Sequence, residues 1–569
     1  MPATHAPLIT PYGGKLVDLL VTGSELHTLK EESSSFESVT LSDRQLCDLE
    51  MLAVGAFSPL TTFMNQADYQ SVLDTMRVAN GTLFPMPITL PVDRQFTPGE
   101  RVALKDGFGN LLAVLKVDEV YLWDPHEFAS KVLGTTDEAH NLVRELRTWG
   151  QYNLSGKLIV LALPTHKDFA NLRLTPVQVR ERLVEIGDGN VVAFQTRNPL
   201  HRAHEEMTKR AATLIKGTLL LHPVVGMTKP GDVDHVTRVR CYMALIDNHY
   251  SDQKKLLSLL PLAMRMAGPR EAVWHAIIRR NYGASYFISG RDHAGPGKDS
   301  SGKPFYAPFE ARDLAKKHET ELGMTIFTFG DMAYVEDDDR YENMDAIPKG
   351  KTTRLISGTQ VREDYLAKGR PLPTWFTCPE VAAILADAYP PSTRQGFCLW
   401  LTGLSGAGKS TIAQGVQAAL EERGRRTTML DGDIVRQNLS KGLGFSRPDR
   451  ETNIKRVGYV ASRVVYHHGV AICALISPYQ SSRQEVRALF DRQNFIEIYV
   501  DTPIDICEQR DPKGHYQNSR QGKIANFTGI DDTYEAPANP ELVIDTTHVA
   551  VTDSVTQILT LLQSRGFIT

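Results

Sequence analysis

One segment near the middle of the chain joins a buried strand to residues that suit phosphate chemistry. Four apolar residues at 191–194 are followed by the polar run QTRNPLHRAH at 195–204. A short apolar run of this kind is typical of a buried parallel strand. Pro199 disfavours a helical conformation at Asn198 and so marks a turn from strand to helix. We expect the helix to begin near Leu200.

The side chains after this turn have the types and the spacing needed to stabilise a phosphorus centre that gains negative charge. With a helix starting there, His201 and His204 lie on one helical face. A helix N-terminus offers free N–H groups and the positive end of a dipole, so phosphate binds well beside it. Arg197 adds a planar fork of donors that matches tetrahedral oxyanions.

A second strand end repeats this arrangement later in the chain. The segment ISGRDHAGPG at 288–297 again follows an apolar run with glycine, arginine, aspartate and histidine. A lone H-x-x-H pair is more often a helix cap or a pair of packed histidines than a site. Two such strand ends in one domain indicate a ligand site, because parallel sheets bind ligands at the carboxyl ends of their strands.

Together these motifs resemble those of the ATP sulfurylase (sulfate adenylyltransferase) family. The resemblance extends to residues 48–50, 55–60, 63–65 and 356–359 and covers roughly the first 390 residues. It implies that sulfate attacks the α-phosphorus of ATP, giving adenylylsulfate (APS) and pyrophosphate. The implied catalytic residues are Thr196, Arg197, Asn198, His201 and His204. The implied ATP- and sulfate-binding residues are Gln195, Thr196, Arg197, Asn198, Gly290, Arg291, Asp292, His293, Ala294 and Ala333.

A second nucleotide site follows a linker at 388–395 that is rich in proline and small polar residues. The apolar run 397–402 leads into GLSGAGKS at 403–410 and then into a helix, which is the order that a phosphate loop requires. Lys409 is expected to reach the β- and γ-oxygens, and the Ser410 hydroxyl to ligate Mg²⁺. The predicted ATP-binding residues are Gly403, Leu404, Ser405, Gly406, Ala407, Gly408, Lys409, Ser410 and Thr411.

The rest of the chain, residues 396–569, resembles APS kinase. The resemblance rests on DGDxxR at 431–436, LGFS at 443–446, DRxxNI at 449–454, ISPY at 476–479 and KxxNFTGID at 523–531. It implies an adenine between two phenylalanines, a phosphosulfate held by three cations, and Asp433 placed to orient or deprotonate the 3′-hydroxyl. The implied APS-binding residues are Asp433, Arg436, Phe445, Arg450, Asn453, Ile476, Ser477, Lys513, Asn526 and Phe527. The implied catalytic residues are Lys409, Asp433 and Ser477.

Two features of this region modify what the resemblance implies. Ser477 matches the family's phosphoserine position, but in-line transfer to a positioned hydroxyl needs no covalent step. A substrate contact is therefore an alternative role for Ser477. The segment HYQNSR at 515–520 also lacks two positive charges that the family usually carries after Lys513, so fewer cations face an anionic substrate there.

The composition excludes several classes of protein. The 569 residues are 42% hydrophobic and 23% charged, as in soluble globular proteins, and they contain no apolar run long enough to span a membrane. A balance of 63 basic against 67 acidic residues argues against a nucleic-acid binder. The six cysteines form no C-x-x-C motif and no secretory signal is recognised, so we expect reduced, buried thiols and a cytoplasmic location.

The order of the expected elements predicts an α/β multidomain fold. Residues 1–168 read as a β-rich module with a hairpin at 102–115, which the resemblance identifies as PUA-like. Residues 169–392 alternate strands and helices, as in a Rossmann-like nucleotidyltransferase domain. Residues 393–569 are expected to form a P-loop kinase domain. In the central domain we expect strands at 190–195, 218–222, 285–289 and 325–329, helices at 234–247 and 270–280, and a solvated acidic loop at 336–339.

These patterns predict a bifunctional sulfate-activating enzyme. It makes APS and pyrophosphate from ATP and sulfate, then phosphorylates APS at the 3′-hydroxyl to give PAPS, with Mg²⁺ accompanying ATP. Two alternatives stay open. In one, the C-terminal domain is a PAPS-binding allosteric module, as in filamentous fungi where the phosphate loop is degraded; the intact loop here favours a kinase. In the other, the sulfurylase runs in reverse to make ATP. We expect a homo-oligomer and no nucleic-acid or membrane partner.

Overall fold

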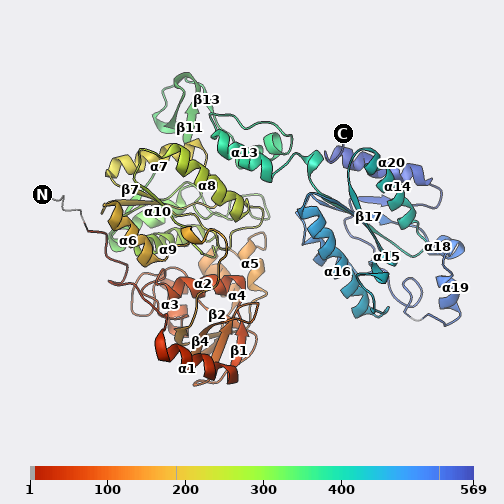
Figure 1. The fold of residues 1–569 in the computed structure, drawn as a ribbon, viewed down its shortest axis with the longest axis horizontal. Helices are drawn as coiled ribbons and strands as arrows, with labels where there is room; N and C mark the ends of the chain where they lie inside the picture. Colours follow the sequence, from red (N-terminus) through yellow and green to blue (C-terminus); the bar gives the residue numbers. More distant parts are fainter. Residues whose placement is uncertain (1–6, 188, 492, 525) are drawn as a thin grey trace. The chain divides into compact units, whose positions relative to one another are not determined.

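The protein folds into two compact units, seen here in a computed structural model that describes residues 7–187, 189–491, 493–524 and 526–569 (Figure 1). Unit 1 contains the chain up to Ile356 together with Leu372–Ile384. Unit 2 contains Ser357–Pro371 and Leu385–Thr569. The division between them falls inside helix α13 (Pro379–Ala388).

The N-terminal part of unit 1 is built on a five-stranded sheet in the order β1-β3-β4-β5-β2. Only β1 and β3 are parallel. The hairpin expected at 102–115 is present as β3 and β4, and Asp106 closes its turn by accepting N–H bonds from Phe108 and Asn110. The elements are α1 (Gly23–Glu32), β1 (Glu37–Thr40), α2 (Asp43–Ala53), α3 (Gln66–Thr75), β2 (Leu90–Val92), β3 (Arg101–Lys105), β4 (Leu111–Leu122), α4 (Pro125–Phe128), α5 (Asn141–Leu146) and β5 (Tyr152–Val160).

The central part of unit 1 is a parallel sheet in the order β10-β9-β6-β7-β8. Strands β6 and β7 are buried along their whole length, as expected for strands covered on both faces. All the strands and helices predicted for this region are present. The elements are α6 (Pro176–Ile186), β6 (Val191–Phe194), α7 (Arg202–Ile215), β7 (Thr218–Leu221), α8 (His235–His249), β8 (Lys255–Leu257), α9 (Gly268–Asn281), β9 (Tyr286–Ile288), α10 (Glu310–Lys317), α11 (Glu319–Leu322) and β10 (Thr325–Phe327).

A small antiparallel sheet follows, in the order β12-β11-β13, which the sequence did not lead us to expect. Its strands are β11 (Met332–Val335), β12 (Arg340–Asn343) and β13 (Thr353–Arg354). The acidic run at 336–339 forms the turn between the first two strands. Its carboxylates pair with Lys351 and Arg354 at the surface, which confirms a solvated loop.

Unit 2 has a parallel five-stranded sheet in the order β15-β16-β14-β17-β18. The predicted strand at 397–402 is β14, which is buried throughout and leads into the phosphate loop. The main elements are β14 (Phe397–Thr402), α14 (Lys409–Glu422), β15 (Thr427–Asp431), α15 (Gly432–Gln437), α16 (Arg447–Tyr466), β16 (Val470–Ala474), α17 (Gln480–Arg487), β17 (Phe495–Val500), α18 (Ile504–Arg510), α19 (His515–Arg520), β18 (Leu542–Ile544) and α20 (Val551–Ser564).

One hydrophobic cluster joins the β-rich module to the central sheet of unit 1. Phe57 packs on Trp274 with ring centroids 5.2 Å apart. Beside this pair Arg265 donates to Asp48 at 2.6 Å, with 2% and 3% of their side chains exposed. The 55–60 segment therefore packs rather than catalyses. The core runs across the boundary that we placed at residue 168, and that boundary stays a prediction.

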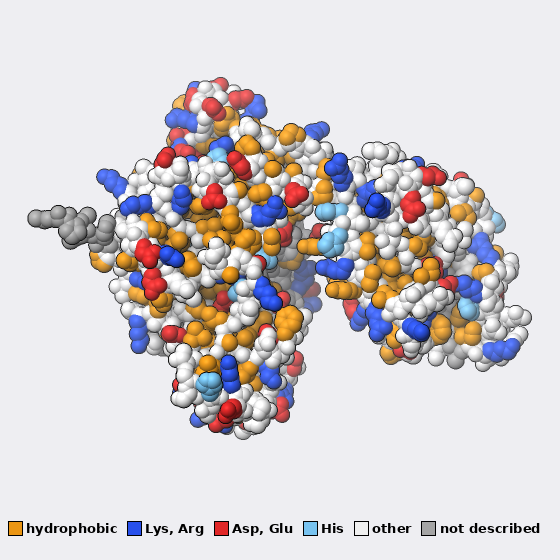
Figure 2. Space-filling model, in the orientation of Figure 1, with side chains coloured by type: hydrophobic (Ala, Val, Ile, Leu, Met, Phe, Trp, Pro, Cys, Tyr) orange, Lys and Arg blue, Asp and Glu red, His pale blue; other side chains and the backbone are white. Residues whose placement is uncertain are grey.

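Several predicted properties of the chain can be compared with the described residues. All six cysteines are free; Cys47 is partly exposed and the others are buried. Among the described residues, no helix combines the length and the apolar composition that a membrane crossing requires. On the face drawn in Figure 2, basic and acidic side chains are interspersed.

The buried pair between Asp48 and Arg265 gives a prediction for stability. Asp48→Ala should lower the free energy of unfolding of unit 1 by about 3–5 kcal/mol, because it leaves a buried guanidinium without its partner. Urea unfolding followed by tryptophan fluorescence measures the change. The matched control is Glu185→Ala, which removes a surface pair with Arg182 whose side chains are 64% and 61% exposed. The control should change stability by less than about 0.5 kcal/mol, and equal losses would contradict the prediction.

Candidate functional site

Two loops meet at the carboxyl ends of adjacent strands in unit 1. Strands β6 and β9 pair in parallel, with Phe194 opposite Ile288, so the loops that follow them leave the same edge of the sheet. Arg197 joins the two loops: it donates to the Gly295 carbonyl at 3.2 Å and to Asp232 Oδ1 at 2.5 Å. Its side chain is 13% exposed. The structure thus brings together the two motifs that the sequence singled out.

The first loop is held in a tight turn by its own side chains. The Thr196 hydroxyl donates to the Asn198 carbonyl at 3.0 Å and accepts the Asn198 N–H at 3.1 Å. Tyr242 donates a further hydrogen bond to the Asn198 carbonyl at 2.7 Å. Gln195 is buried at the strand end, and its Oε1 has no hydrogen-bond partner among the residues that the structure describes. An unpaired buried acceptor at this place is available to a ligand donor.

The helix after this turn begins at Arg202 rather than near Leu200, so His201 is the N-cap and lies outside the helix. The backbone of His201 is extended, and its N–H donates a hydrogen bond to His204 Nδ1 at 3.3 Å. The two imidazole centroids are 6.2 Å apart, and the His201 ring lies 4.2 Å from that of Phe376. The pair therefore forms a helix cap: His201 precedes the helix and His204 lies in its first turn. Contrary to our expectation, the two imidazoles are not neighbours on one helical face.

Burial determines the charge of both histidines. It lowers the pKa of His201 to about 3, with a smaller contribution from His204, and lowers the pKa of His204 to about 4. Both imidazoles are thus neutral near pH 7 in the ligand-free protein. Because Nδ1 of His204 accepts a hydrogen bond, its proton lies on Nε2. His204 can therefore offer an N–H donor to an oxyanion without carrying a charge.

The second loop, from Gly290 to Gly295, has a compact backbone that favours glycine at position 295. A Cβ at Gly295 would lie 1.8 Å from Asp292 Oδ1, so no larger residue fits there without a rearrangement. Ala294 has a left-handed backbone with φ 53°, and its carbonyl accepts the Gly268 N–H at 3.2 Å. Arg291 is exposed.

A salt bridge connects this loop to the small sheet. Arg291 pairs with Asp331 at 2.6 Å, directly before β11, the strand that carries the buried Ala333. Arg210 on α7 also bonds Glu342 on β12 at 2.8 Å. The predicted adenine contact at Ala333 is thus tied to both α7 and the second loop.

The phosphate loop of unit 2 has the backbone that phosphate binding requires. Gly403, Gly406 and Gly408 have φ values of 148°, 76° and 97°, and a Cβ at Gly403 would lie 2.4 Å from the Val500 carbonyl. Lys409 folds back to donate to the Gly403 carbonyl at 3.0 Å and to the Leu404 carbonyl at 2.7 Å. Burial lowers the pKa of Lys409 to about 8.

The residues beside Lys409 fit a magnesium ion. The Ser410 hydroxyl donates to Asp431 Oδ2 at 2.5 Å, and Asp431 ends strand β15. Hydroxyl and carboxylate oxygens are the hard ligands that Mg²⁺ prefers. Asp431 also caps α15 by accepting the Asp433 N–H at 3.0 Å. The DGD run led us to predict Asp433 but not Asp431, although a carboxylate at the end of a strand also indicates a ligand position.

All three predicted APS-binding cations have partners within unit 2. Asp433 and Lys513 form a salt bridge with both side chains about half exposed. The Arg436 guanidinium lies 4.3 Å from the centroid of the Phe445 ring. Arg450 donates to the Phe445 carbonyl at 2.8 Å and to the Asn526 carbonyl at 2.6 Å. The structure therefore groups Arg436, Phe445, Arg450 and Asn526.

Four further predicted residues lie in unit 2, and all of them except the partly exposed Ile476 are buried. The Ser477 hydroxyl donates to Thr402 Oγ1 at 2.8 Å and accepts the Trp400 indole N–H at 3.1 Å, and Ile476 supplies the carbonyl that Thr402 bonds at 2.7 Å. Phe527 packs edge-on against Tyr516, with centroids 5.0 Å apart. Asn453 is buried, and its Oδ1 has no partner in the described part of the chain, which leaves it an acceptor for a ligand.

Comparisons with known proteins agree with both sites. Residues 9–163 match the family model of a PUA-like domain, residues 170–388 that of ATP-sulfurylase and residues 395–545 that of adenylylsulphate kinase. Proteins named sulfate adenylyltransferase from Yarrowia lipolytica and Chaetomium globosum are 45% and 46% identical over 569 and 570 residues, covering 98% of this chain and 99% of each relative. The chain belongs to the sulfate adenylyltransferase family.

A solved structure described as a hexameric APS kinase from Thiobacillus denitrificans has a TM-score of 0.76 at 35% identity, over 99% of this chain and 100% of that one. The predicted fold, with PUA-like, sulfurylase and P-loop kinase parts, is confirmed. The chain is a sulfate-activating enzyme that carries a sulfurylase domain and an APS kinase domain.

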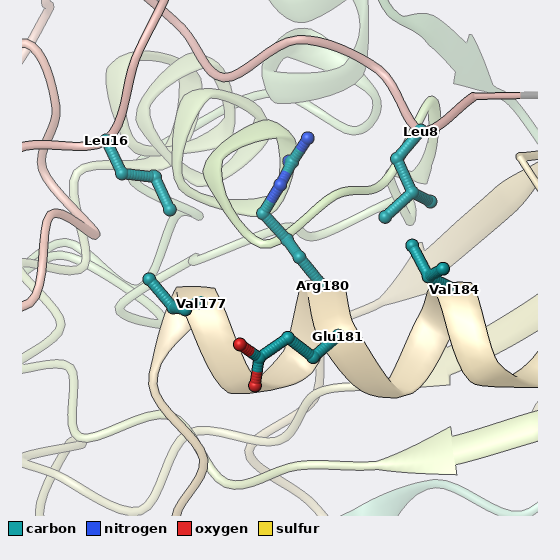
Figure 3. Close-up of a pocket in the computed structure, with 6 residues that line it drawn as sticks. All are labelled: Leu8, Leu16, Val177, Arg180, Glu181 and Val184. Carbon is teal, nitrogen blue, oxygen red and sulfur yellow. The ribbon is translucent and has the colours of Figure 1, made fainter.

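A groove on the surface of unit 1 lies apart from the residues of the sulfurylase site. This groove of about 520 Å³ lies between α6 and the N-terminal segment (Figure 3). Its lining is mostly apolar. Arg180, the cation among its lining residues, donates hydrogen bonds to the carbonyls of Ile9 and Arg280. None of its lining residues is a predicted site residue. The polar strand-end loops, rather than this groove, carry the groups that can react.

The buried histidines of the sulfurylase site give a prediction for pH dependence. Unfolded imidazoles take up protons below about pH 6.5, whereas folded His204 stays neutral down to about pH 4. The unfolded state then binds more protons, so stability rises with pH between about 4 and 6.5. In His204→Gln this slope should be smaller by up to about 1.4 kcal/mol per pH unit.

Urea unfolding of wild type and variant across pH 5–6.5 measures the difference in slope. His27→Gln is the matched control, because this imidazole is exposed on α1 and stays in water in both states. An unchanged slope in His204→Gln would show that His204 is charged in the folded protein.

Proposed function

We propose that unit 1 forms APS and pyrophosphate from ATP and sulfate at the β6 and β9 loops, and that unit 2 converts APS to PAPS. The observation that carries this proposal is the joining of the two loops by Arg197 on the same chain as an intact phosphate loop. The three domains, with boundaries after residues 168 and 392, are part of the proposal.

In the first reaction a sulfate oxygen attacks the α-phosphorus of ATP, a new P–O–S bond forms, and the bond to the β-phosphate breaks. Gln195, Arg197 and the Ala294 N–H hold sulfate, and Thr196 and Asn198 fix the loop that presents them. His201 and His204 act as neutral donors to the oxygens that gain charge, a role worth most where water is excluded. The adenine lies against Ala333.

In the second reaction the 3′-hydroxyl of APS attacks the γ-phosphorus of a second ATP. Lys409 binds the transferring phosphoryl group, and Ser410 with Asp431 holds Mg²⁺, which supplies charge neutralisation when bound. Arg436 and Arg450 bind the phosphosulfate beside Phe445. Lys513 exchanges its partner Asp433 for the phosphosulfate, which frees Asp433 for the acceptor hydroxyl.

Ser477 acts in this scheme by position rather than as a phosphate carrier. Its hydroxyl is buried and is already bonded to Thr402 and Trp400. A phosphoryl group on Ser477 would remove the proton that the hydroxyl donates to Thr402 and would have to enter a buried space. A substrate contact through its strained backbone, with φ 40°, is the simpler role.

The alternatives are less well supported. A regulatory C-terminal domain does not need the glycine backbone, Lys409 and the Ser410–Asp431 pair that are all present here. A sulfurylase that runs in reverse to make ATP uses the same transition state. A kinase on the same chain favours the forward direction, because it consumes APS and so shifts the equilibrium towards APS formation. We also propose a homo-oligomer in the cytoplasm, in keeping with the hexameric relative and the six free thiols.

Arg197→Lys tests the sulfurylase assignment. The variant keeps the charge but loses the fork that reaches Asp232 and Gly295 together. We expect turnover to fall by about 100-fold or more, in both the forward and the pyrophosphate-consuming directions. Radiolabelled sulfate incorporation and pyrophosphate-dependent ATP formation measure the two directions. A change confined to the KM for ATP would show that Arg197 only binds the nucleotide.

Lys409→Ala tests whether unit 2 is a catalyst. The variant should make no PAPS from ATP, Mg²⁺ and APS, while APS formation from sulfate continues. APS should then accumulate only to its unfavourable equilibrium, and added pyrophosphatase should raise that level. Chromatography of the labelled nucleotides separates the products. A wild-type protein that makes no PAPS, and whose sulfurylase kinetics become sigmoidal on adding PAPS, would show that unit 2 is a regulator.

A further inference from the structure

Three buried side chains form a row behind the second loop of the sulfurylase site. The first two, Glu271 and His275, lie one turn apart on α9, and the third, His293, lies in the loop. His275 Nδ1 is hydrogen-bonded to His293 Nε2 at 2.9 Å. His275 Nε2 lies 3.2 Å from Glu271 Oε1, a charge contact rather than a hydrogen bond, because this nitrogen has no hydrogen-bond partner among the described residues. Glu271 and His275 are fully buried and His293 is 9% exposed. Such a row is costly unless its members satisfy one another.

The contacts of Glu271 define which way the hydrogen bonds run. Its two carboxylate oxygens accept the backbone N–H groups of Arg265 at 3.0 Å and Ala267 at 2.7 Å. Burial raises the pKa of Glu271, and the two backbone N–H bonds and the Arg265 charge oppose this by less. When Glu271 is ionised, its charge 3.2 Å from His275 Nε2 favours the tautomer that carries the proton on Nε2. In that tautomer Nδ1 of His275 is an acceptor, and the proton between the two rings belongs to His293 Nε2.

The loop that carries His293 is held between α9 and Arg197. On one side, the Gly268 N–H at the start of α9 donates to the Ala294 carbonyl at 3.2 Å. On the other side, the Gly295 carbonyl accepts one arm of the Arg197 guanidinium at 3.2 Å. The His275–His293 hydrogen bond is therefore a second anchor between α9 and the loop, two residues from the carbonyl that receives Arg197.

We propose that Glu271 and His275 are positioning residues of the sulfurylase site, which hold the imidazole of His293 and through it the loop that sets Arg197. Neither residue touches substrate in this arrangement. The inference rests on the proposed role of the β6 and β9 loops. It adds two residues of α9 that lie outside both motifs and that act by keeping the loop in register with the reacting groups.

Two substitutions of His275 separate this role from packing. In His275→Asn, the amide oxygen lies near the place of Nδ1 and still accepts the proton of His293. In His275→Met, the side chain fills the apolar space but offers His293 no comparable acceptor. We expect His275→Met to lower sulfurylase turnover by about 10- to 100-fold with a much smaller change in the KM for ATP. His275→Asn should retain most of the turnover.

A packing role predicts the opposite order, because methionine fills the space while asparagine leaves a cavity and a buried polar group. Two controls accompany the pair. PAPS formation from added APS should be unchanged in both variants, since the kinase lies in unit 2. His222→Asn removes another fully buried imidazole, directly after β7. Its ring nitrogens have no hydrogen-bond partner within the described ranges, and the variant should retain sulfurylase turnover.

A direct measurement needs no variant. In protein labelled with ¹⁵N-histidine, an N–H···N bond gives a scalar coupling between His293 Nε2 and His275 Nδ1, with the proton on His293. The proposal is overturned if an active wild type shows no such coupling, if His275→Met keeps full turnover, or if His275→Asn loses as much as His275→Met. A wild type that makes no APS would instead overturn the proposed function.

Discussion

The parallel pairing of β6 with β9 is the constraint on which the sulfurylase site depends. It places two loops at one edge of a sheet, so a side chain from one can bond the backbone of the other. Arg197 bridges the two loops in this way. Its nearly buried guanidinium is stabilised because Asp232 and the Gly295 carbonyl both accept hydrogen bonds from it. Slipping either strand by one residue would turn its side chains to the other face and leave this charge unpaired.

The two anion-binding sites proposed for this chain differ in the contacts that hold their residues in place. In unit 1 the two loops are held by partly buried hydrogen bonds, and burial keeps His201 and His204 neutral. In unit 2 the phosphate loop is fixed by its glycines, but Asp433 and Lys513 are half exposed and paired with each other. In the proposed mechanism the first site is therefore held by its own contacts, whereas the second exchanges an ion pair for its substrate.

Much of this was predictable from sequence, because the signals are local. Strand β14 has the predicted bounds of 397–402, and its phosphate loop needs only glycines and a following helix. What the sequence did not reveal depends on tertiary contacts or on short elements. Asp232 matters only because the fold brings it to Arg197. Strands β11 to β13 are too short to show a period, and the N-cap position of His201 follows from an extended backbone after Pro199.

The Asp433–Lys513 pair bears on how the proposed kinase avoids wasting ATP. An aspartate able to deprotonate a hydroxyl can also activate water, so a kinase benefits if this aspartate is occupied until its acceptor is bound. In the ligand-free protein Lys513 occupies Asp433. In the proposed reaction, the negative charge of an arriving phosphosulfate would compete for Lys513 and release the carboxylate for the 3′-hydroxyl. The same exchange would weaken APS binding, since an ion pair must break. The proposed mechanism would thus obtain selectivity for the acceptor at the expense of affinity.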